Sequence, residues 1–61
     1  MPVVEITLIE GRSLEIKERL HAKVAEAIHQ AIDAPHEAIR IIIREVPPAH
    51  FSVGGVTKAE K

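Results

Sequence analysis

The first nine residues decide the fold, and they read Met1-Pro2-Val3-Val4-Glu5-Ile6-Thr7-Leu8-Ile9. Their alternation predicts a β-strand with Val4, Ile6 and Leu8 on one apolar face. Removal of the initiator Met, its usual fate before a small residue, makes the Pro2 nitrogen a secondary amine. An amine at the end of a packed strand can serve as a base or a nucleophile. While Met1 stays attached, the same nitrogen is a tertiary amide without useful basicity.

A helix is predicted over residues 14 to about 32. Ser13 is a favourable N-cap for it. Apolar residues recur at helical spacing and predict the face that packs on the strands: Ile16, Leu20, Val24, Ala27, Ile28, Ala31 and Ile32. The opposite side, which includes Lys17, is predicted to be a solvated charged face. Pro35 ends the helix because proline disfavours a helical conformation in the residue before it, and a short turn is expected over residues 35–37.

A second strand is predicted over residues 38–46, which are rich in β-branched side chains. Its two faces carry Ile39, Ile41 and Ile43 on one side and Arg40, Ile42 and Arg44 on the other. Pro47 and Pro48 stop it, because proline cannot continue a hydrogen-bonded ladder. Residues 51–56 then predict a hairpin, or a turn between two short extended pieces.

Strand, helix, strand defines a βαβ unit of the α/β (α+β) class, a single domain over residues 1–61 with a C-terminal hairpin. Its two strands are expected to be parallel, with a right-handed crossover. Two strands are too few for a stable sheet, and parallel sheets are normally covered on both faces. One helix covers one face, so a second copy of the chain is expected to cover the other. Glu5 and Arg44 are candidates for paired charges at that interface.

Composition excludes several function classes. The chain has 61 residues, no Cys, 8 basic and 9 acidic residues, and Phe51 as its only aromatic. Nucleic-acid binding is not expected, because neither a basic patch nor stacking aromatics are present. No apolar run approaches the roughly 20 residues of a membrane span, and no signal peptide is recognisable. A cytoplasmic location without membrane association is therefore predicted. The four His lack metal-site spacing, so no metal is expected.

Four residues remain as candidates for chemistry: Pro2, Arg12, Arg40 and Phe51. Taken singly, each has an ordinary explanation, because an Arg after a turn is usually solvated, an Arg on a strand can be an ion-pair partner, and Phe is more often core or interface. In a parallel βαβ unit, the loop after the first strand and the start of the second strand lie at opposite ends of the sheet. Arg12 and Arg40 of one chain are thus not expected to meet, whereas oligomer contacts can bring the Arg40 of a neighbour to the site.

Several stretches together closely resemble the 4-oxalocrotonate tautomerase family. They are Pro2 behind the initiator Met, Glu10-Gly11-Arg12-Ser13 after the first strand, Asp33-Ala34-Pro35, Arg40 within an Ile-rich strand, and His50-Phe51-Ser52-Val53-Gly54-Gly55. The resemblance runs through essentially the whole chain. It implies a cofactor-independent isomerase of aromatic compound degradation, without metal, that forms a homohexamer. This assembly is a trimer of dimers, in which each dimer has a four-stranded sheet with two helices on one side.

The resemblance also implies roles for the four candidates. Pro2 is the catalytic base that converts 2-hydroxymuconate, a dienol, to the conjugated keto acid. Arg12 binds the distal carboxylate of the substrate and draws electron density toward it. Arg40, from another subunit, holds the proximal carboxylate and the enol or keto oxygen, and Phe51 forms part of an apolar wall. Burial and neighbouring Arg charges would lower the pKa of the Pro2 amine below the ordinary ~7.7–8.0, which favours the neutral base.

Two departures from the family pattern bear on the substrate. The chain ends in residues 57–61 with two Lys, where family members often carry an Arg-rich tail, and residues 47–49 form a stiff Pro-Pro entry to the Phe51 segment. Two other functions stay open. One is a hydratase or dehalogenase that uses Pro2, although such chemistry usually needs a further carboxylate to activate water. The other is a non-catalytic oligomeric module that binds a small anion.

Overall fold

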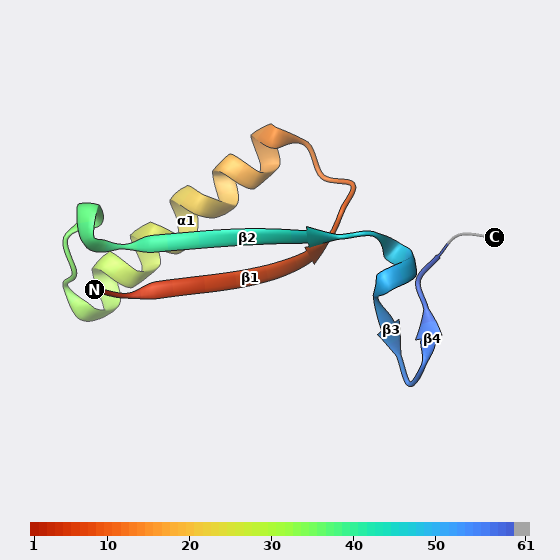
Figure 1. The fold of residues 1–61 in the computed structure, drawn as a ribbon. Helices are drawn as coiled ribbons and strands as arrows, with labels where there is room; N and C mark the ends of the chain where they lie inside the picture. Colours follow the sequence, from red (N-terminus) through yellow and green to blue (C-terminus); the bar gives the residue numbers. More distant parts are fainter. Residues whose placement is uncertain (60–61) are drawn as a thin grey trace.

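The computed structural model describes residues 1–59, so the last two residues of the C-terminal tail that contains two Lys lie outside the described part. The elements, in order, are β1 (Val3–Ile9), α1 (Leu14–Ile32), the 3-10 turn η1 (His36–Ala38), β2 (Arg40–Val46), the 3-10 turn η2 (Pro48–His50), β3 (Ser52–Val53) and β4 (Val56–Thr57). Figure 1 shows β1 and β2 side by side, α1 along one side of them, and the β3–β4 hairpin projecting beyond the sheet. The predicted βαβ unit with a C-terminal hairpin is confirmed.

β1 and β2 pair in parallel over their whole length. The register runs from Val3 opposite Arg40 to Ile9 opposite Val46. A hydrogen bond from the Arg40 amide to the Pro2 carbonyl, 3.0 Å long, extends the pairing one step before β1. The predicted faces are confirmed as well, because alternate residues of each strand are covered by α1 or open to solvent.

The ends of α1 follow from local chemistry. The Ser13 side chain accepts a hydrogen bond from the Ile16 amide at 3.2 Å, which satisfies one of the free amides of the first turn. At the other end, Asp33 adopts the left-handed conformation with φ 62°, and its amide donates to the His29 carbonyl at 2.9 Å. This cap turns the chain back toward β2, and the predicted helix boundaries are confirmed.

The face of α1 that packs on the sheet differs from the prediction. It carries Lys17, Leu20, His21, Val24, Ala25 and Ile28, whereas Ile16 and Ile32 are 45% and 63% exposed. A strict i, i+4 series drifts about 40° around the helix at each step, because four residues exceed one turn of 3.6. Residues at the two ends of the predicted stripe therefore cannot face one sheet. Lys17, predicted to be solvated, instead pairs with Glu45 at 3.0 Å.

β2 begins at Arg40 rather than at residue 38. The Ala38 amide donates to the Pro35 carbonyl at 3.0 Å, and the Ile39 amide donates to the His36 carbonyl at 3.1 Å. These two bonds close the 3-10 turn η1, so residue 38 belongs to a turn and cannot also pair with β1. The short turn predicted over residues 35–37 forms one residue later, over His36–Ala38.

The sheet face opposite α1 has no cover within the described residues. Val3 and Ile42 on this face are 55% and 43% exposed. Glu5 and Arg44 face each other here at 3.9 Å within one chain, because the parallel register places Thr7 opposite Arg44 and Glu5 one pleat away. The predicted charge pair therefore forms inside the chain rather than requiring a second copy.

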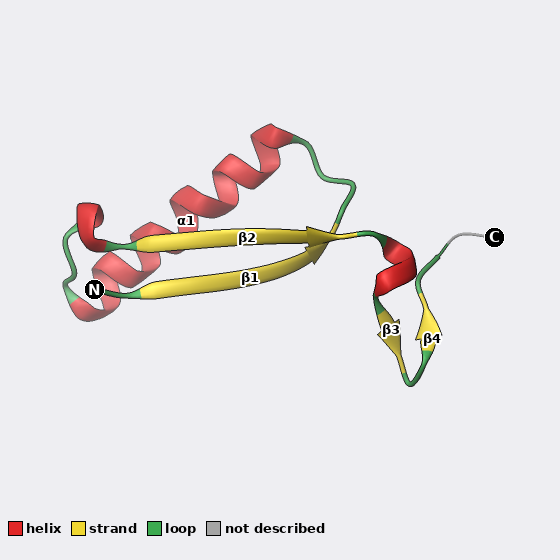
Figure 2. Ribbon diagram, viewed as in Figure 1, coloured by secondary structure: helices red, strands yellow, loops and turns green. Residues whose placement is uncertain are grey.

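The described chain has no fully buried side chain. Its Cα radius of gyration is 14.4 Å, with extents of 45 × 25 × 14 Å, whereas a compact chain of this length has roughly 10–11 Å. The hairpin accounts for part of this extension, since it projects away from the sheet and carries Val53 and Val56 at 64% and 73% exposure (Figure 2). Residues 1–59 on their own form a thin layer without an interior.

Candidate functional site

Pro2 lies directly before β1, at the end of the sheet where β2 begins. Its carbonyl accepts the hydrogen bond from the Arg40 amide, and its ring is partly covered. Met1 before it is 80% exposed. Removal of Met1 would leave an amine at the start of a paired strand.

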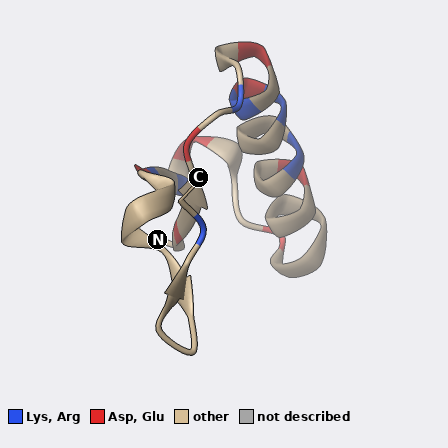
Figure 3. Cartoon of the chain, turned by 90° about the vertical axis from the view of Figure 1, so that its right-hand side faces the viewer, with Lys and Arg blue, Asp and Glu red and all other residues tan. Residues whose placement is uncertain are grey.

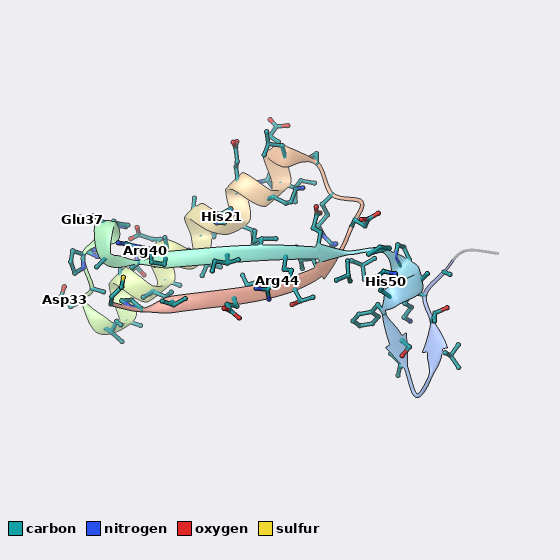
Figure 4. All side chains as sticks on the ribbon, in the orientation of Figure 1. His21, Asp33, Glu37, Arg40, Arg44 and His50 are labelled. Carbon is teal, nitrogen blue, oxygen red and sulfur yellow. The ribbon has the colours of Figure 1, made fainter. Side chains whose placement is uncertain are left out.

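Arg40 is the first residue of β2, and its side chain is exposed. Its Nη1 donates a hydrogen bond of 2.6 Å to the Glu37 carbonyl of η1. Figure 4 shows Arg40, Glu37 and Asp33 together at this end of the molecule. A guanidinium has five N–H donors in a planar fork, so one bond to Glu37 leaves further donors for a carboxylate.

Arg12 lies at the opposite end of β1. Its Nη1 donates to the Ile9 carbonyl at 3.2 Å, and the residue is exposed. β1 has seven residues, and at about 3.3 Å per residue this strand alone separates Pro2 from Arg12 by roughly 23 Å. The prediction that Arg12 and Arg40 lie at opposite ends of the sheet is confirmed by the register.

Phe51 follows η2, beyond the end of β2, with 38% of its surface exposed. Its amide donates to the Pro48 carbonyl at 3.2 Å, and its carbonyl accepts from the Lys58 amide at 2.9 Å. These bonds hold it at the base of the hairpin, which carries no charged residue (Figure 3). Within one chain the four candidates thus form two groups at opposite ends of the sheet, and residues 1–59 enclose no pocket.

A histidine cluster, defined by Glu26, His29 and His36, lies at the Pro2 end of the fold. The rings of His29 and His36 stack with centroids 4.3 Å apart and planes inclined by 28°. His36 Nε2 lies 3.1 Å from Glu26 Oε1, and His29 Nδ1 lies 2.8 Å from the Ala34 carbonyl oxygen. Hydrogen bonds from His36 and then Gln30 lower the pKa of the Glu26 carboxyl below its ordinary value.

Sequence reasoning treated each His separately and missed this cluster. The i, i+3 spacing of Glu26 and His29 on the predicted helix was a usable signal. The turn that returns His36 to the helix gave no usable sequence signal, because it depends on the left-handed Asp33.

Within residues 1–59 no group of three or more His, Asp or Glu side chains is arranged to hold a metal ion. In the same span, α1 and the 3-10 turns are too short or too polar to cross a membrane.

Comparison with known proteins agrees with this architecture. The model of the tautomerase enzyme family matches residues 2–61. The 2-hydroxymuconate tautomerase of Stutzerimonas stutzeri is 49% identical over 55 residues, and one from Pseudomonas putida is 47% identical over the same length. Each alignment covers 90% of this chain and 87% of the relative.

Solved structures of 4-oxalocrotonate tautomerases are also similar to this chain. A chain of the heterohexamer 4-oxalocrotonate tautomerase of Chloroflexus aurantiacus superposes with a TM-score of 0.93 at 45% identity, covering 98% of this chain and 97% of that one. A 4-oxalocrotonate tautomerase isozyme of Methylibium petroleiphilum gives 0.90 at 40% identity, covering 93% and 92%. Fold and sequence together define an isomerase with a βαβ architecture. The chain belongs to the tautomerase family, as its resemblance predicted, and is similar to the 2-hydroxymuconate tautomerases.

Proposed function

We propose that this protein is a cofactor-independent tautomerase that converts 2-hydroxydienoate acids, such as 2-hydroxymuconate, to the conjugated keto acid. The observation that carries the proposal is the position of Pro2 directly before β1, one residue behind an exposed Met1. Relatives with 46–49% identity carry the name 2-hydroxymuconate tautomerase. In this proposal residues 1–61 act as one tautomerase-like domain.

The chemistry follows from an amine and two guanidinium groups. The neutral Pro2 nitrogen takes the proton of the substrate hydroxyl, and the resulting protonated amine delivers a proton to a carbon of the dienolate. A general base of this kind contributes about 10²–10⁴-fold to a rate. Arg12 binds the distal carboxylate, and Arg40 binds the proximal carboxylate and the developing enolate oxygen. Fixed positive charge is most effective where negative charge develops during the reaction.

The site is proposed to form between chains. The roughly 23 Å length of β1 separates Pro2 from Arg12 within a chain, so a site that uses both draws on at least two chains. The uncovered sheet face and the absence of a buried side chain in residues 1–59 favour the same conclusion. Burial of such apolar surface is the main driving force of association. We propose a homohexamer built as a trimer of dimers, and one relative, from Chloroflexus aurantiacus, is described as a heterohexamer.

Ketonisation of 2-hydroxymuconate, followed by ultraviolet absorbance, tests the function. Pro2→Ala is expected to lower kcat/KM, because the amine changes both its basicity and its position. Arg12→Ala is expected to lower kcat/KM because the distal carboxylate of the substrate binds less tightly without the guanidinium. Unchanged ketonisation by Pro2→Ala rules out Pro2 as the base. A panel that adds halogenated and unsaturated acids separates the tautomerase from a hydratase or dehalogenase.

A further inference from the structure

We infer that His36 is a positioning residue that holds Arg40 ready for substrate, acting through the turn η1. The inference rests on the proposed role of Arg40 in binding the proximal carboxylate. It assigns a function to the histidine cluster of Glu26, His29 and His36, which the proposed mechanism does not otherwise use.

The cluster fastens η1 to the end of α1. The Ala34 carbonyl can only accept, so His29 Nδ1 carries the proton and donates across 2.8 Å. This bond sets the orientation of the His29 ring, and the His36 ring stacks on it at 4.3 Å. His36 Nε2 then donates to the Glu26 carboxylate at 3.1 Å.

The attachment adds to a turn that has few hydrogen bonds of its own. The turn has three residues, closed by the hydrogen bonds from Ala38 to Pro35 and from Ile39 to His36. Short 3-10 segments have poorer hydrogen-bond geometry than an α-helix, so their own bonds hold them weakly. Its N-cap, Pro35, makes no side-chain capping bond. The His36 side chain supplies a tertiary contact between the turn and α1, beside the half-buried Ala38 and Ile39 and the Arg40 backbone bond to Pro2.

The same turn holds the guanidinium of Arg40. Glu37, the residue after His36, offers its carbonyl oxygen to Arg40 Nη1 at 2.6 Å. This bond selects one orientation of a long and flexible side chain before substrate arrives. The remaining donors of the fork stay available for a carboxylate, which favours bidentate binding. Displacement of η1 would move the Glu37 carbonyl and release the Arg40 side chain.

Two variants of His36 separate its ring from its hydrogen bond. His36→Phe keeps the stack on His29 but removes the donor to Glu26, and His36→Gln keeps an amide donor but removes the ring. His36→Phe is expected to raise KM for 2-hydroxymuconate roughly 2- to 10-fold, the range set by the cost of ordering one flexible side chain. His36→Gln is expected to recover part of this loss. Glu26→Leu, which removes the acceptor of the His36 hydrogen bond, should resemble His36→Phe, and Glu18→Leu, on the exposed side of the same helix, is the matched control.

A double-mutant cycle with Arg40→Ala decides the inference. If His36 acts through Arg40, His36→Phe has no further effect on kcat/KM in the Arg40→Ala background. An equal effect in both backgrounds, or no effect of either His36 variant while Arg40→Ala is impaired, overturns the inference and leaves the proposed function intact. If Arg40→Ala itself binds and converts substrate normally, the proposed role of Arg40 fails. Circular dichroism and sedimentation of each variant identify any loss of fold or assembly.

Discussion

The amide of Arg40 donates a hydrogen bond to the carbonyl of Pro2 across 3.0 Å, and this bond joins the first residue of β2 to the residue before β1. It holds the candidate amine at one end of the sheet. Arg12 lies beyond the other end, where it bonds to the Ile9 carbonyl. In the proposed site, the two arginines that bind the two ends of one substrate therefore come from different chains.

Removal of Met1 is the condition for the proposed chemistry. The residue is 80% exposed, and the small residue after it favours cleavage. An intact-mass measurement of the isolated protein is expected to show a chain that is lighter by one methionine. A protein that keeps Met1 and still ketonises 2-hydroxymuconate would contradict the assignment of Pro2 as the base, because a tertiary amide cannot accept the proton.

Mixing two impaired variants tests whether the site forms between chains. Pro2→Ala and Arg12→Ala, refolded together, are expected to show more activity than either variant alone. Random mixing restores both native groups in roughly one quarter of the sites of a symmetric oligomer when the groups come from different chains. Refolding each variant separately and combining them afterwards is the control. No recovery after joint refolding would mean that both groups act from the same chain.

The pair of Lys17 and Glu45 is expected to stabilise the packing of α1 on the sheet. The side chains are 25% and 26% exposed, and Glu45 Oε2 is buried without a hydrogen-bond partner among the described residues. Lys17→Met keeps the apolar stem but removes the partner of Oε1, so the free energy of unfolding should fall by about 1–3 kcal/mol.

Thermal unfolding at one fixed protein concentration measures this effect, because assembly makes Tm depend on concentration. Lys23→Met, on the exposed side of α1, is the control and should change stability by about 0.5 kcal/mol or less. The double variant Lys17→Met with Glu45→Leu should recover most of the loss, since two apolar groups leave no charge without a partner. A Lys17→Met protein as stable as the parent would show that the pair contributes nothing.

The Glu26 carboxyl is expected to make the stability of the fold depend on pH in the acid range. Its hydrogen bond from His36 lowers its pKa below 4.5, the ordinary value. A carboxyl with a lowered pKa in the folded state stabilises the fold above its unfolded pKa, and this contribution is lost as pH falls through the folded value. The parent protein should therefore unfold at a higher temperature than Glu26→Gln above pH 4.5. The difference should shrink at lower pH, and an unchanged difference would exclude the linkage.

Much of the architecture could be predicted because it depends on local patterns. The alternation of residues 3–9, the Ser13 cap and the Gly54-Gly55 turn each specify local geometry through side-chain direction, capping or allowed backbone angles. The prediction of which residues of α1 face the sheet was wrong at the two ends of the helix, because an i, i+4 series drifts around a helix. Lys17 in particular was placed in solvent, although Glu45, 28 residues later, draws it to the sheet.

The sequence by itself determined the βαβ order, the family and the identity of the four candidate residues, since these follow from periodicity and from residues that stand in a fixed order. Only the tertiary structure decided how they are grouped. The parallel register puts Pro2 with Arg40 and leaves Arg12 and Phe51 at the far end. The left-handed Asp33 returns η1 to α1, and so brings His36 onto His29 and Glu26. Such contacts join residues distant in the chain, and no local pattern encodes them.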